Sequence, residues 1–199
     1  MRPFSQACEN NRQPILDVLR AVFADSGCIL EIGSGTGQHA AYFAPALSPT
    51  IWQPSDLVRN HAGIDAWIDA HPIDNLRRPL DLDVDRQPWP VAADIDGIFT
   101  ANTCHIMAWS SVENMFAGAA HLLGAGAALV IYGPFNYGGE FTSPSNARFD
   151  AMLRRQASHQ GIRDFEAIER LAAGQGFELG EDYPMPANNR LLVWRKKAR

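Results

Sequence analysis

Short apolar runs and longer amphipathic stretches alternate along the whole chain. The apolar runs have the length of strands, and those around Leu30, Phe99 and Val130 are continuous enough for strands that are buried on both faces. Between them, apolar side chains recur every three or four residues, as they do on one face of a helix. An alternation of strands and helices is typical of an α/β fold with a mostly parallel sheet.

The same pattern predicts seven strands, of which the last two form an antiparallel pair at the end of the sheet. We expect strands at residues 29–32, 50–56, 80–85, 96–102, 126–132, 176–179 and 191–194. We expect helices at residues 14–23 and 38–47, around Ile64, at 112–123, from Asn146, and from Asp164 as its N-cap. No internal repeat or low-complexity linker interrupts the pattern, so we expect a single domain over residues 1–199.

Three glycines follow the first predicted strand at alternate positions, Gly33, Gly35 and Gly37. Glycine lets the backbone turn sharply and approach a ligand with no Cβ in the way. The helix predicted at residues 38–47 would direct its first free N–H groups back over this turn. The turn therefore indicates a small-ligand site, although an ordinary strand-to-helix connection would use the same residues.

The spacing of the glycines bears on the class of ligand. A dinucleotide-binding turn has its third glycine three positions after the second, whereas Gly37 follows Gly35 by two. Glu31 would repel a nearby phosphate but would suit an α-ammonium group. The turn therefore favours a ligand with an ammonium group over a dinucleotide.

Polar residues also lie near the ends of later strands, where ligands of open α/β sheets bind. An acid about 20 residues past the glycine turn can accept hydrogen bonds from ribose hydroxyls, and we expect Asp56 in this role, with Gln53 as the alternative. Asp56 could equally cap the following helix. Asn102 and His105 fall on the ligand side of the fourth strand, and the glycine- and aromatic-rich loop at residues 133–139 follows the fifth.

The polar segment at residues 10–14 leads into the first predicted helix. Pro14 suits the first turn of that helix. We expect it to be a loop that could act as a lid.

Composition disfavours several classes of partner. The formal net charge is -5, and the only basic run lies at the C-terminal tip, so nucleic acid is not an expected partner. No stretch has the apolar length of a membrane span, and the N-terminus is polar rather than signal-like, so we expect a cytoplasmic protein. The three cysteines and six histidines lack the spacing of a disulfide framework or a metal site, so no metal is expected.

The chain resembles class I S-adenosylmethionine-dependent methyltransferases over essentially its whole length. The pattern Glu-x-Gly-x-Gly-x-Gly from Glu31 is similar to their first motif. A closer resemblance is to the branch that includes methyltransferase-like protein twenty-six and its bacterial relatives. It is carried by residues 11–15, 31–39, 52–56, 82–84, 102–106, 132–135, 161–164 and 185–189. The resemblance implies a Rossmann-like, seven-stranded, mostly parallel sheet with an antiparallel C-terminal hairpin and helices on both faces.

The resemblance also implies S-adenosylmethionine as the cofactor and S-adenosylhomocysteine as its product. Asp83, near the end of the third strand, would bind the adenine amino group, and Val84 would lie against the ring. The cofactor-binding residues implied by the resemblance are Glu31, Gly33, Gly35, Gly37, Asp56, Asp83, Val84 and Asn102. We expect Asn11, Ser34, His39 and Leu57 to bind the cofactor as well.

Methyl transfer from a sulfonium requires chiefly approach geometry and the exclusion of water. A neutral oxygen or nitrogen acceptor must also lose a proton. His105 is the best-placed candidate base and Tyr132 the second, although His105 could equally be a structural histidine. We expect a small-molecule acceptor in a polar pocket formed by Phe135, Asn136, Arg163, Asn188 and Asn189.

The expected function is therefore an S-adenosylmethionine-dependent methyltransferase. The segment Asn102-Thr103-Cys104 does not match the Asn-Pro-Pro-Tyr motif of many amino-methylating enzymes, which disfavours methylation of nucleobases or glutamine amides. The alternative is a protein that binds S-adenosylmethionine or S-adenosylhomocysteine without catalysis and acts through a partner. A nicotinamide-dependent oxidoreductase is disfavoured by the glycine spacing and by Glu31. Neither the acceptor nor the oligomeric state follows from the sequence.

Overall fold

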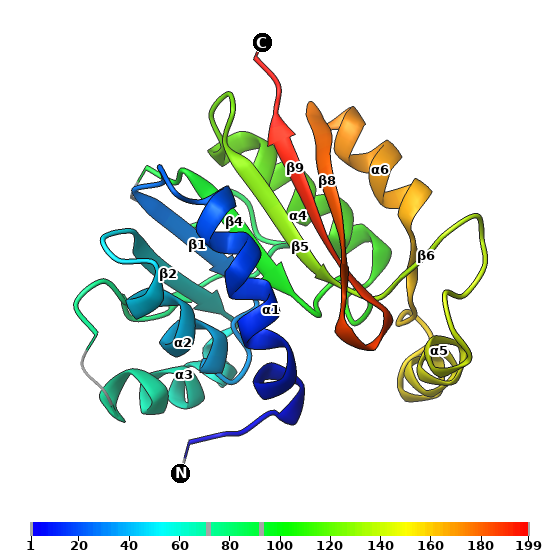
Figure 1. Ribbon diagram of the computed structural model, residues 1–199, viewed down its shortest axis with the longest axis horizontal. Helices are drawn as coiled ribbons and strands as arrows, with labels where there is room; N and C mark the ends of the chain where they lie inside the picture. The colour runs from blue at the N-terminus through cyan, green and yellow to red at the C-terminus, as the bar shows by residue number, and fades with distance from the viewer. Residues whose placement is uncertain (1, 71–72, 92–93, 199) are drawn as a thin grey trace. The chain divides into compact units, whose positions relative to one another are not determined.

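A computed structural model describes residues 2–70, 73–91 and 94–198 (Figure 1). The strands are β1 (Cys28–Ile32), β2 (Ile51–Asp56), β3 (Leu80–Asp81), β4 (Gly97–Ala101), β5 (Ala128–Gly133), β6 (Phe135–Asn136), β7 (Arg163–Asp164), β8 (Phe177–Met185) and β9 (Asn189–Lys196). The helices are α1 (Gln6–Val22), α2 (Gln38–Ala46), α3 (Val58–Ala70), α4 (Trp109–Leu122), α5 (Pro144–Gln156) and α6 (Phe165–Gly174).

Seven of the strands form a mostly parallel sheet in the order β3-β2-β1-β4-β5-β9-β8, and β9 runs antiparallel to both of its neighbours. The predicted α/β class, the seven strands and the antiparallel C-terminal pair are thus confirmed. The chain divides into two compact units, with the boundary between Thr100 and Ala101. The expected single domain stays a prediction.

The first unit is built around β1, in which every residue is buried. Leu30 lies in parallel register with Gln53 of β2 on one side and with Ile98 of β4 on the other. A strand that is covered on both faces needs an apolar run rather than an alternating pattern. Cys28-Ile29-Leu30 is such a run, and the buried Glu31 interrupts it before Ile32.

Helix α1 begins earlier than predicted. The proline at position 14 lies inside the helix, and Ser5 is the N-cap, with its Oγ accepting a hydrogen bond from the backbone N–H of Cys8 at 3.4 Å. The expected loop at residues 10–14, and with it the proposed lid, is therefore wrong. Proline disfavours a helix interior because it lacks the N–H donor, but the buried face of α1, with Ile15, Leu16 and Leu19, outweighs this local preference.

Strand β3 is much shorter than the predicted strand at residues 80–85. After Asp81 the chain makes one more ladder contact, from the N–H of Leu82 to the carbonyl of Asp56, and then turns, with the N–H of Arg86 bonded to the carbonyl of Asp83. The alternation of apolar and acidic residues is real, because Leu82 and Val84 are buried, but it continues into a turn.

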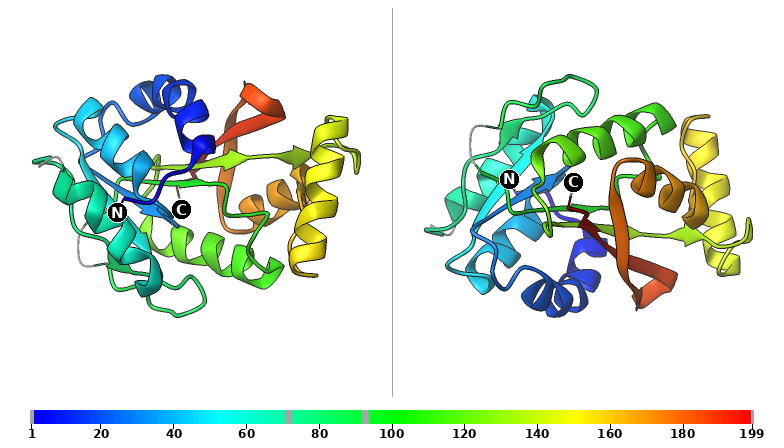
Figure 2. Two further views of the ribbon diagram at one scale, coloured as in Figure 1. Left: turned by 90° about the horizontal axis from the view of Figure 1, so that it is seen from below. Right: turned by 90° about the horizontal axis from the view of Figure 1, so that it is seen from above.

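The second unit contains β5, β9 and β8 as an antiparallel set. Gly133 at the end of β5 lies opposite Arg190 of β9. The core of this unit includes Phe116 of α4, Phe177 of β8 and Trp194 of β9, whose rings meet edge to face. Both views in Figure 2 show the carboxyl end of β5 directed towards α5 (yellow).

Two features of the second unit differ from the sequence analysis. The loop after β5 contains the short strand β6, which pairs in parallel with β7 through Phe135↔Arg163 and Asn136↔Asp164. The helical spacing of Phe149, Met152 and Leu153 predicts that they share the buried face of α5, but Met152 is 39% exposed, whereas Asp150 and Leu153 are buried. Among the residues that the structure describes, no helix has the length and apolar character needed to cross a bilayer.

Candidate functional site

The three glycines after β1 adopt left-handed backbone conformations, with φ of 70° at Gly33, 57° at Gly35 and 84° at Gly37. A Cβ on Gly37 would lie 2.8 Å from the Cα of Ile64 in α3, so this glycine permits close packing. A Cβ on Gly35 would have only the carbonyl oxygen of Gly33 within 4.0 Å. The turn therefore leaves open space above Gly35, where a ligand can approach the backbone.

Asp56 at the end of β2 holds this turn in place. Its Oδ2 accepts a hydrogen bond from the backbone N–H of Gly35 at 2.8 Å. Its Oδ1 accepts from the N–H of Leu57 at 2.7 Å and from Nδ2 of Asn60 at 2.8 Å. Because an ionised carboxylate offers about four acceptor positions, these contacts leave roughly one for a ligand hydroxyl.

Gln53, the alternative residue for the ribose, is occupied differently. Its Nε2 donates to the carbonyls of Pro54 at 3.0 Å and Arg78 at 2.8 Å. One N–H group of this amide therefore bonds within β2, and the other ties β2 to the segment before β3. Of the two candidates, Asp56 is the one that contacts the glycine turn.

Glu31 is fully enclosed, with 2% of its surface exposed. Its Oε2 accepts hydrogen bonds from Oγ of Ser34 at 2.9 Å and from Nε1 of Trp52 at 3.0 Å. Burial raises the pKa of this carboxyl to about 7, an effect that the two hydrogen bonds oppose and the charge of Asp56 reinforces. Glu31 thus exchanges a proton near neutral pH, close to the glycine turn.

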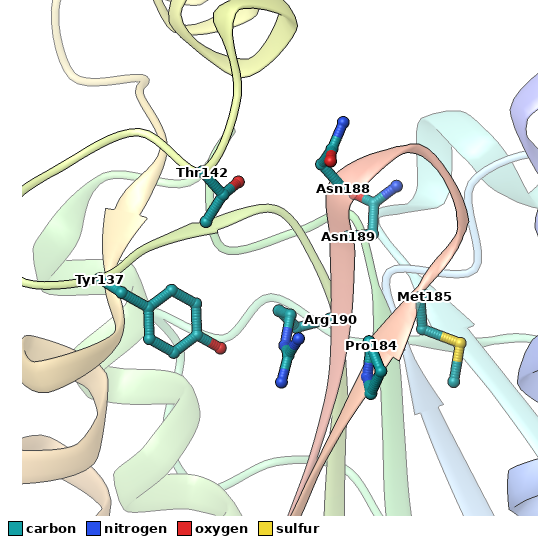
Figure 3. Close-up of a pocket in the computed structure, with 7 residues that line it drawn as sticks. All are labelled: Tyr137, Thr142, Pro184, Met185, Asn188, Asn189 and Arg190. Carbon is teal, nitrogen blue, oxygen red and sulfur yellow. The ribbon is translucent and has the colours of Figure 1, made fainter.

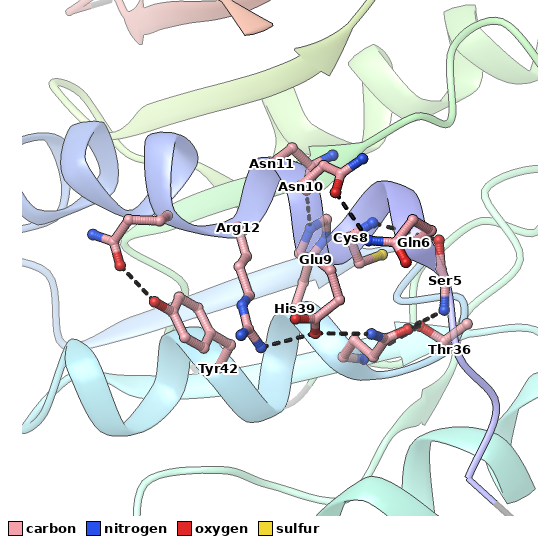
Figure 4. Close-up of polar contacts among 12 residues, drawn as sticks. Ser5, Gln6, Cys8, Glu9, Asn10, Asn11, Arg12, Thr36, His39 and Tyr42 are labelled. Carbon is pink, nitrogen blue, oxygen red and sulfur yellow. Dashed lines mark hydrogen bonds and ion pairs between the residues drawn. The ribbon is translucent and has the colours of Figure 1, made fainter. Parts of the chain in front are cut away.

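Asn11 and His39 form a buried pair between α1 and α2, with 2.8 Å between Oδ1 of Asn11 and Nε2 of His39 (Figure 4). The His39 ring also stacks on Phe43 at a centroid distance of 5.0 Å. Burial, and then the positive charge of Arg12, lowers the pKa of His39 to about 4. His39 is therefore neutral at physiological pH, and the pair fixes α1 against α2.

Further polar contacts join the same two helices. Glu9 of α1 accepts from Nε2 of Gln38 at 3.3 Å and pairs with Arg12 at 2.8 Å (Figure 4). The hydroxyl of Tyr42 in α2 donates to Gln13. The residues that the sequence placed in a loop are thus part of a helix that packs beside the glycine turn.

Asp83 and Val84 lie in the turn after β3. The Asp83 carboxylate accepts from the N–H of Asp85 at 3.1 Å and pairs at 3.3 Å with the exposed Arg86. Val84 is buried. The turn places these two residues as a partly exposed acid beside an apolar side chain.

In the second unit, Asn102 has a left-handed φ of 59° and donates its N–H to the carbonyl of Tyr132 at 2.8 Å. His105 follows in a short turn and is buried, with its ring edge-on to Phe149 at 5.3 Å. Its backbone carbonyl accepts from the N–H of Gly161 at 2.9 Å. Burial, and then the charge of Arg163, lowers the pKa of His105 to about 4.

Arg163 and Asn136 belong to the small β6–β7 sheet. The Arg163 guanidinium donates to the backbone carbonyls of Cys104, Met107 and His159, so it holds the segment around His105 in place. Asn136 donates from Nδ2 to Asp164 at 3.2 Å, and its buried Oδ1 has no partner among the described residues. Phe135 is 1% exposed and Tyr132 2% exposed.

A cavity of about 370 Å³ lies near the β8–β9 turn (Figure 3). Its lining consists of Tyr137, Thr142, Pro184, Met185, Asn188, Asn189 and Arg190. Of the residues expected to form the acceptor pocket, Asn188 and Asn189 line this cavity, whereas Phe135, Asn136 and Arg163 are not among its lining residues.

The other lining residues were missed by the sequence analysis. Tyr137 belongs to the loop at residues 133–139 and Met185 to the stretch 185–189, so the sequence analysis had singled out the segments that contain them. No feature of the sequence indicated Arg190 as a binding residue, because only the register of β9 brings it to the cavity. Within residues 2–70, 73–91 and 94–198, no group of three or more His, Cys, Asp or Glu side chains is arranged to hold a metal ion.

The fold is similar to that of solved methyltransferases. An O-methyltransferase family protein from Burkholderia thailandensis superposes with a TM-score of 0.80 at 18% identity, covering 94% of this chain and 56% of that chain. An O-methyltransferase family 2 protein from Planctomyces limnophilus, in complex with apigenin, superposes with a TM-score of 0.82 at 18% identity, covering 96% of this chain and 57% of that chain. Human N-acetylserotonin methyltransferase, in complex with S-adenosylmethionine, superposes with a TM-score of 0.74 at 14% identity, covering 94% of this chain and 55% of that chain.

This chain therefore spans a little over half the length of these three proteins. At such identities, the similarity establishes the methyltransferase fold alone. A family model described as "Protein of unknown function (DUF938)" matches residues 2–196, almost the whole sequence, and the chain belongs to that family.

Proposed function

We propose that this chain is an S-adenosylmethionine-dependent methyltransferase that acts on a small-molecule acceptor and belongs near the branch of methyltransferase-like protein twenty-six. The glycine turn after β1 carries the proposal. It combines three left-handed glycines, open space above Gly35, and a tether to Asp56 at the end of the next strand. The methyltransferase fold, and the S-adenosylmethionine held by one protein of that fold, support it.

The residues of the first unit fit this cofactor. Asp56 retains acceptor capacity for one ribose hydroxyl while it keeps its bonds to Gly35 and Leu57. Asp83 and Val84 offer an acceptor and an apolar surface of the kind that an adenine needs. Once bound, the cofactor would supply an electrophilic methyl group on a sulfonium. A nearby positive charge of this kind would favour the ionised form of Glu31.

The low pKa of His105 limits what it can do as a base. At neutral pH its imidazole is unprotonated and so able to accept a proton, but its conjugate acid is strong. A hydroxyl that has just received a methyl group is a far stronger acid, so a weak base suffices if the proton leaves after methyl transfer. His105 therefore suits late proton removal from an oxygen acceptor, and Tyr132 remains the second candidate.

The test is calorimetric titration of the purified protein with S-adenosylmethionine and S-adenosylhomocysteine. We expect Asp56→Ala to weaken binding by about 1–3 kcal/mol, because a hydrogen bond to the ribose and the tether to Gly35 are both lost. Asp81→Ala is the matched control, since it removes the same charge from an exposed position at the end of β3. It should leave the affinity within about twofold.

Two results would redirect the proposal. Absence of binding by the unmodified protein, with or without binding of NADH, would contradict the cofactor assignment. Binding of S-adenosylmethionine without methyl transfer to a panel of hydroxylated aromatic compounds would support the alternative of a non-catalytic protein that acts through a partner.

A further inference from the structure

The cavity of about 370 Å³ lies at the edge of the sheet where ligands of this fold class bind. Gly133, the last residue of β5, is in register with Arg190, which lines the cavity. In open α/β sheets, ligands bind beyond the carboxyl ends of the parallel strands. The volume falls at the lower end of the range for small-molecule pockets, roughly 300–1,000 Å³.

The charge of the lining is already compensated. Arg190 is the one formally charged side chain among the lining residues, and its Nε donates to Oδ1 of Asp182 at 2.7 Å. A second N–H of Arg190 donates to the Asp182 carbonyl at 3.1 Å, and the Tyr137 hydroxyl donates to Oδ2 at 2.8 Å. An anionic ligand would have to compete with this carboxylate for Arg190, and a cation would face the guanidinium.

The two sides of the cavity differ in chemistry. Tyr137 lies on one side, with its ring stacked on Phe165 at 5.0 Å and the Arg190 guanidinium 5.6 Å from its centroid, so the ring orientation is restricted. Met185 and the amides of Asn188 and Asn189 lie across the cavity from it (Figure 3). The lining thus combines an aromatic ring, an apolar thioether and two amides, groups that suit a flat molecule with a polar edge.

The turn that carries these amides is anchored. Nδ2 of Asn146 in α5 donates to the carbonyl of Asn188 at 3.1 Å, and Nδ2 of Asn189 donates to the carbonyl of Pro186 at 3.0 Å. Ala187 and Asn188 both have left-handed backbone conformations, with φ of 58° and 57°. Asn188 therefore presents its side chain from a fixed tight turn.

We propose that this cavity binds the methyl acceptor, and that the acceptor is an uncharged, flat molecule whose hydroxyl and carbonyl oxygens bind to the amides of Asn188 and Asn189. The role as acceptor site rests on the proposed methyltransferase function. The chemical class of the ligand rests on the cavity alone.

Three probes of the same shape test the class of ligand: 4-hydroxybenzamide, 4-hydroxybenzoate and 4-hydroxybenzamidine. They are respectively neutral, anionic and cationic at neutral pH. Dissociation constants from ligand-observed NMR titration, with and without S-adenosylhomocysteine, should show the neutral amide binding at least fivefold more tightly than either ion. Equal or tighter binding of an ion, or no binding of the amide in either condition, would overturn the inference.

Variants locate the binding site. Asn188→Gly removes the amide while keeping a residue that adopts a positive φ without strain, and Met185→Trp fills the cavity. Each variant should weaken the binding of 4-hydroxybenzamide at least fivefold. Met152→Trp, at an exposed position of α5 and outside the lining, is the matched control and should change nothing. Unchanged affinity in both cavity variants would overturn the assignment.

The two proposals fail separately. If the amide binds as expected but the protein does not bind S-adenosylmethionine by calorimetry, the methyltransferase function and the acceptor role are overturned, and the ligand class stands. If S-adenosylmethionine binds and the amide does not, the function stands and the inference is overturned.

Discussion

Burial has opposite effects on the two kinds of titratable group in the first unit. Glu31 gains a proton affinity close to that of histidine in water, because a carboxylate loses its hydration when enclosed. His39 loses proton affinity for the same reason, because its charged form is the one that burial disfavours. Both groups are consequently neutral over part of the range in which their free counterparts are charged.

Glu31 should make the folded state less stable as pH rises. Between its usual pKa of 4.5 and its folded value of about 7, the unfolded chain has released this proton and the folded chain retains it. The free energy of unfolding therefore falls across this window, by about 3 kcal/mol from this group when the full pKa difference is converted. His39 and His105, with a pKa of about 4, have the opposite effect. Between pH 4 and 6.5 they make the free energy of unfolding rise with pH, because only the unfolded chain binds these protons.

The effect is measured as the difference between the unmodified protein and Glu31→Gln, in which the histidine contributions cancel. Urea unfolding at pH 4.5 to 8 should show the unmodified protein losing stability relative to the variant until about pH 7. A difference that is independent of pH would contradict the raised pKa.

Gly37 is a second single-residue constraint. Gly37→Ala places a Cβ 2.8 Å from the Cα of Ile64, at a φ of 84°, so both backbone strain and a clash with α3 oppose it. We expect a loss of about 1–3 kcal/mol in the free energy of unfolding. Gly124→Ala is the control, because nothing lies within 4 Å of its Cβ position, and it should change stability by less than about 1 kcal/mol. Equal effects in thermal or urea unfolding would contradict the packing role.

Helix α1 shows how an element can depart from its local sequence signals. The sequence predicted that this helix begins at Pro14, because proline suits a first helical turn. The polar residues before it are typical of a loop. The helix nevertheless extends through them, and Asn11 there makes a buried hydrogen-bond contact with His39 of α2. The amphipathic face from Ile15 onward was readable from the sequence, whereas a hydrogen bond between residues 28 positions apart was not.

The contribution of this contact can be measured with two neighbouring asparagines. Asn11→Ala leaves a buried ring nitrogen of His39 without its partner, and we expect a loss of about 1–3 kcal/mol in the free energy of unfolding. Asn10→Ala removes only an exposed contact with Gln6 and should cost less than about 0.5 kcal/mol. Similar values for the two variants in urea unfolding would show that α1 does not depend on the Asn11–His39 pair.

At the scale of the whole molecule, net charge limits the possible partners. With 17 Lys and Arg against 22 Asp and Glu, the chain has a net charge of -5 and lacks the long-range attraction that drives binding to a phosphate backbone. We expect no binding of a 20-base-pair DNA duplex or a 20-nucleotide RNA at 150 mM salt, measured by fluorescence anisotropy up to about 10 µM protein. A submicromolar affinity would contradict a small-molecule acceptor.

The order of strands and helices, the glycine turn and the acid at the end of β2 were all predictable from the sequence. These features depend on apolar periodicity and on the conformational freedom of glycine, which act over a few residues. The end of β3 was not predictable, because a pattern of alternating burial continues equally well into a turn.

The sequence by itself determined the fold class and the position of the glycine turn. Only the tertiary structure decided which polar residues line a cavity and which are held by backbone carbonyls elsewhere. Arg163 had the chemistry of a binding residue but is held by three carbonyls, whereas Tyr137 and Arg190 line a cavity together because β9 pairs with β5 and β8. Hydrogen-bonding capacity is a property of a residue, but whether that capacity is already used depends on neighbours that are distant in the chain.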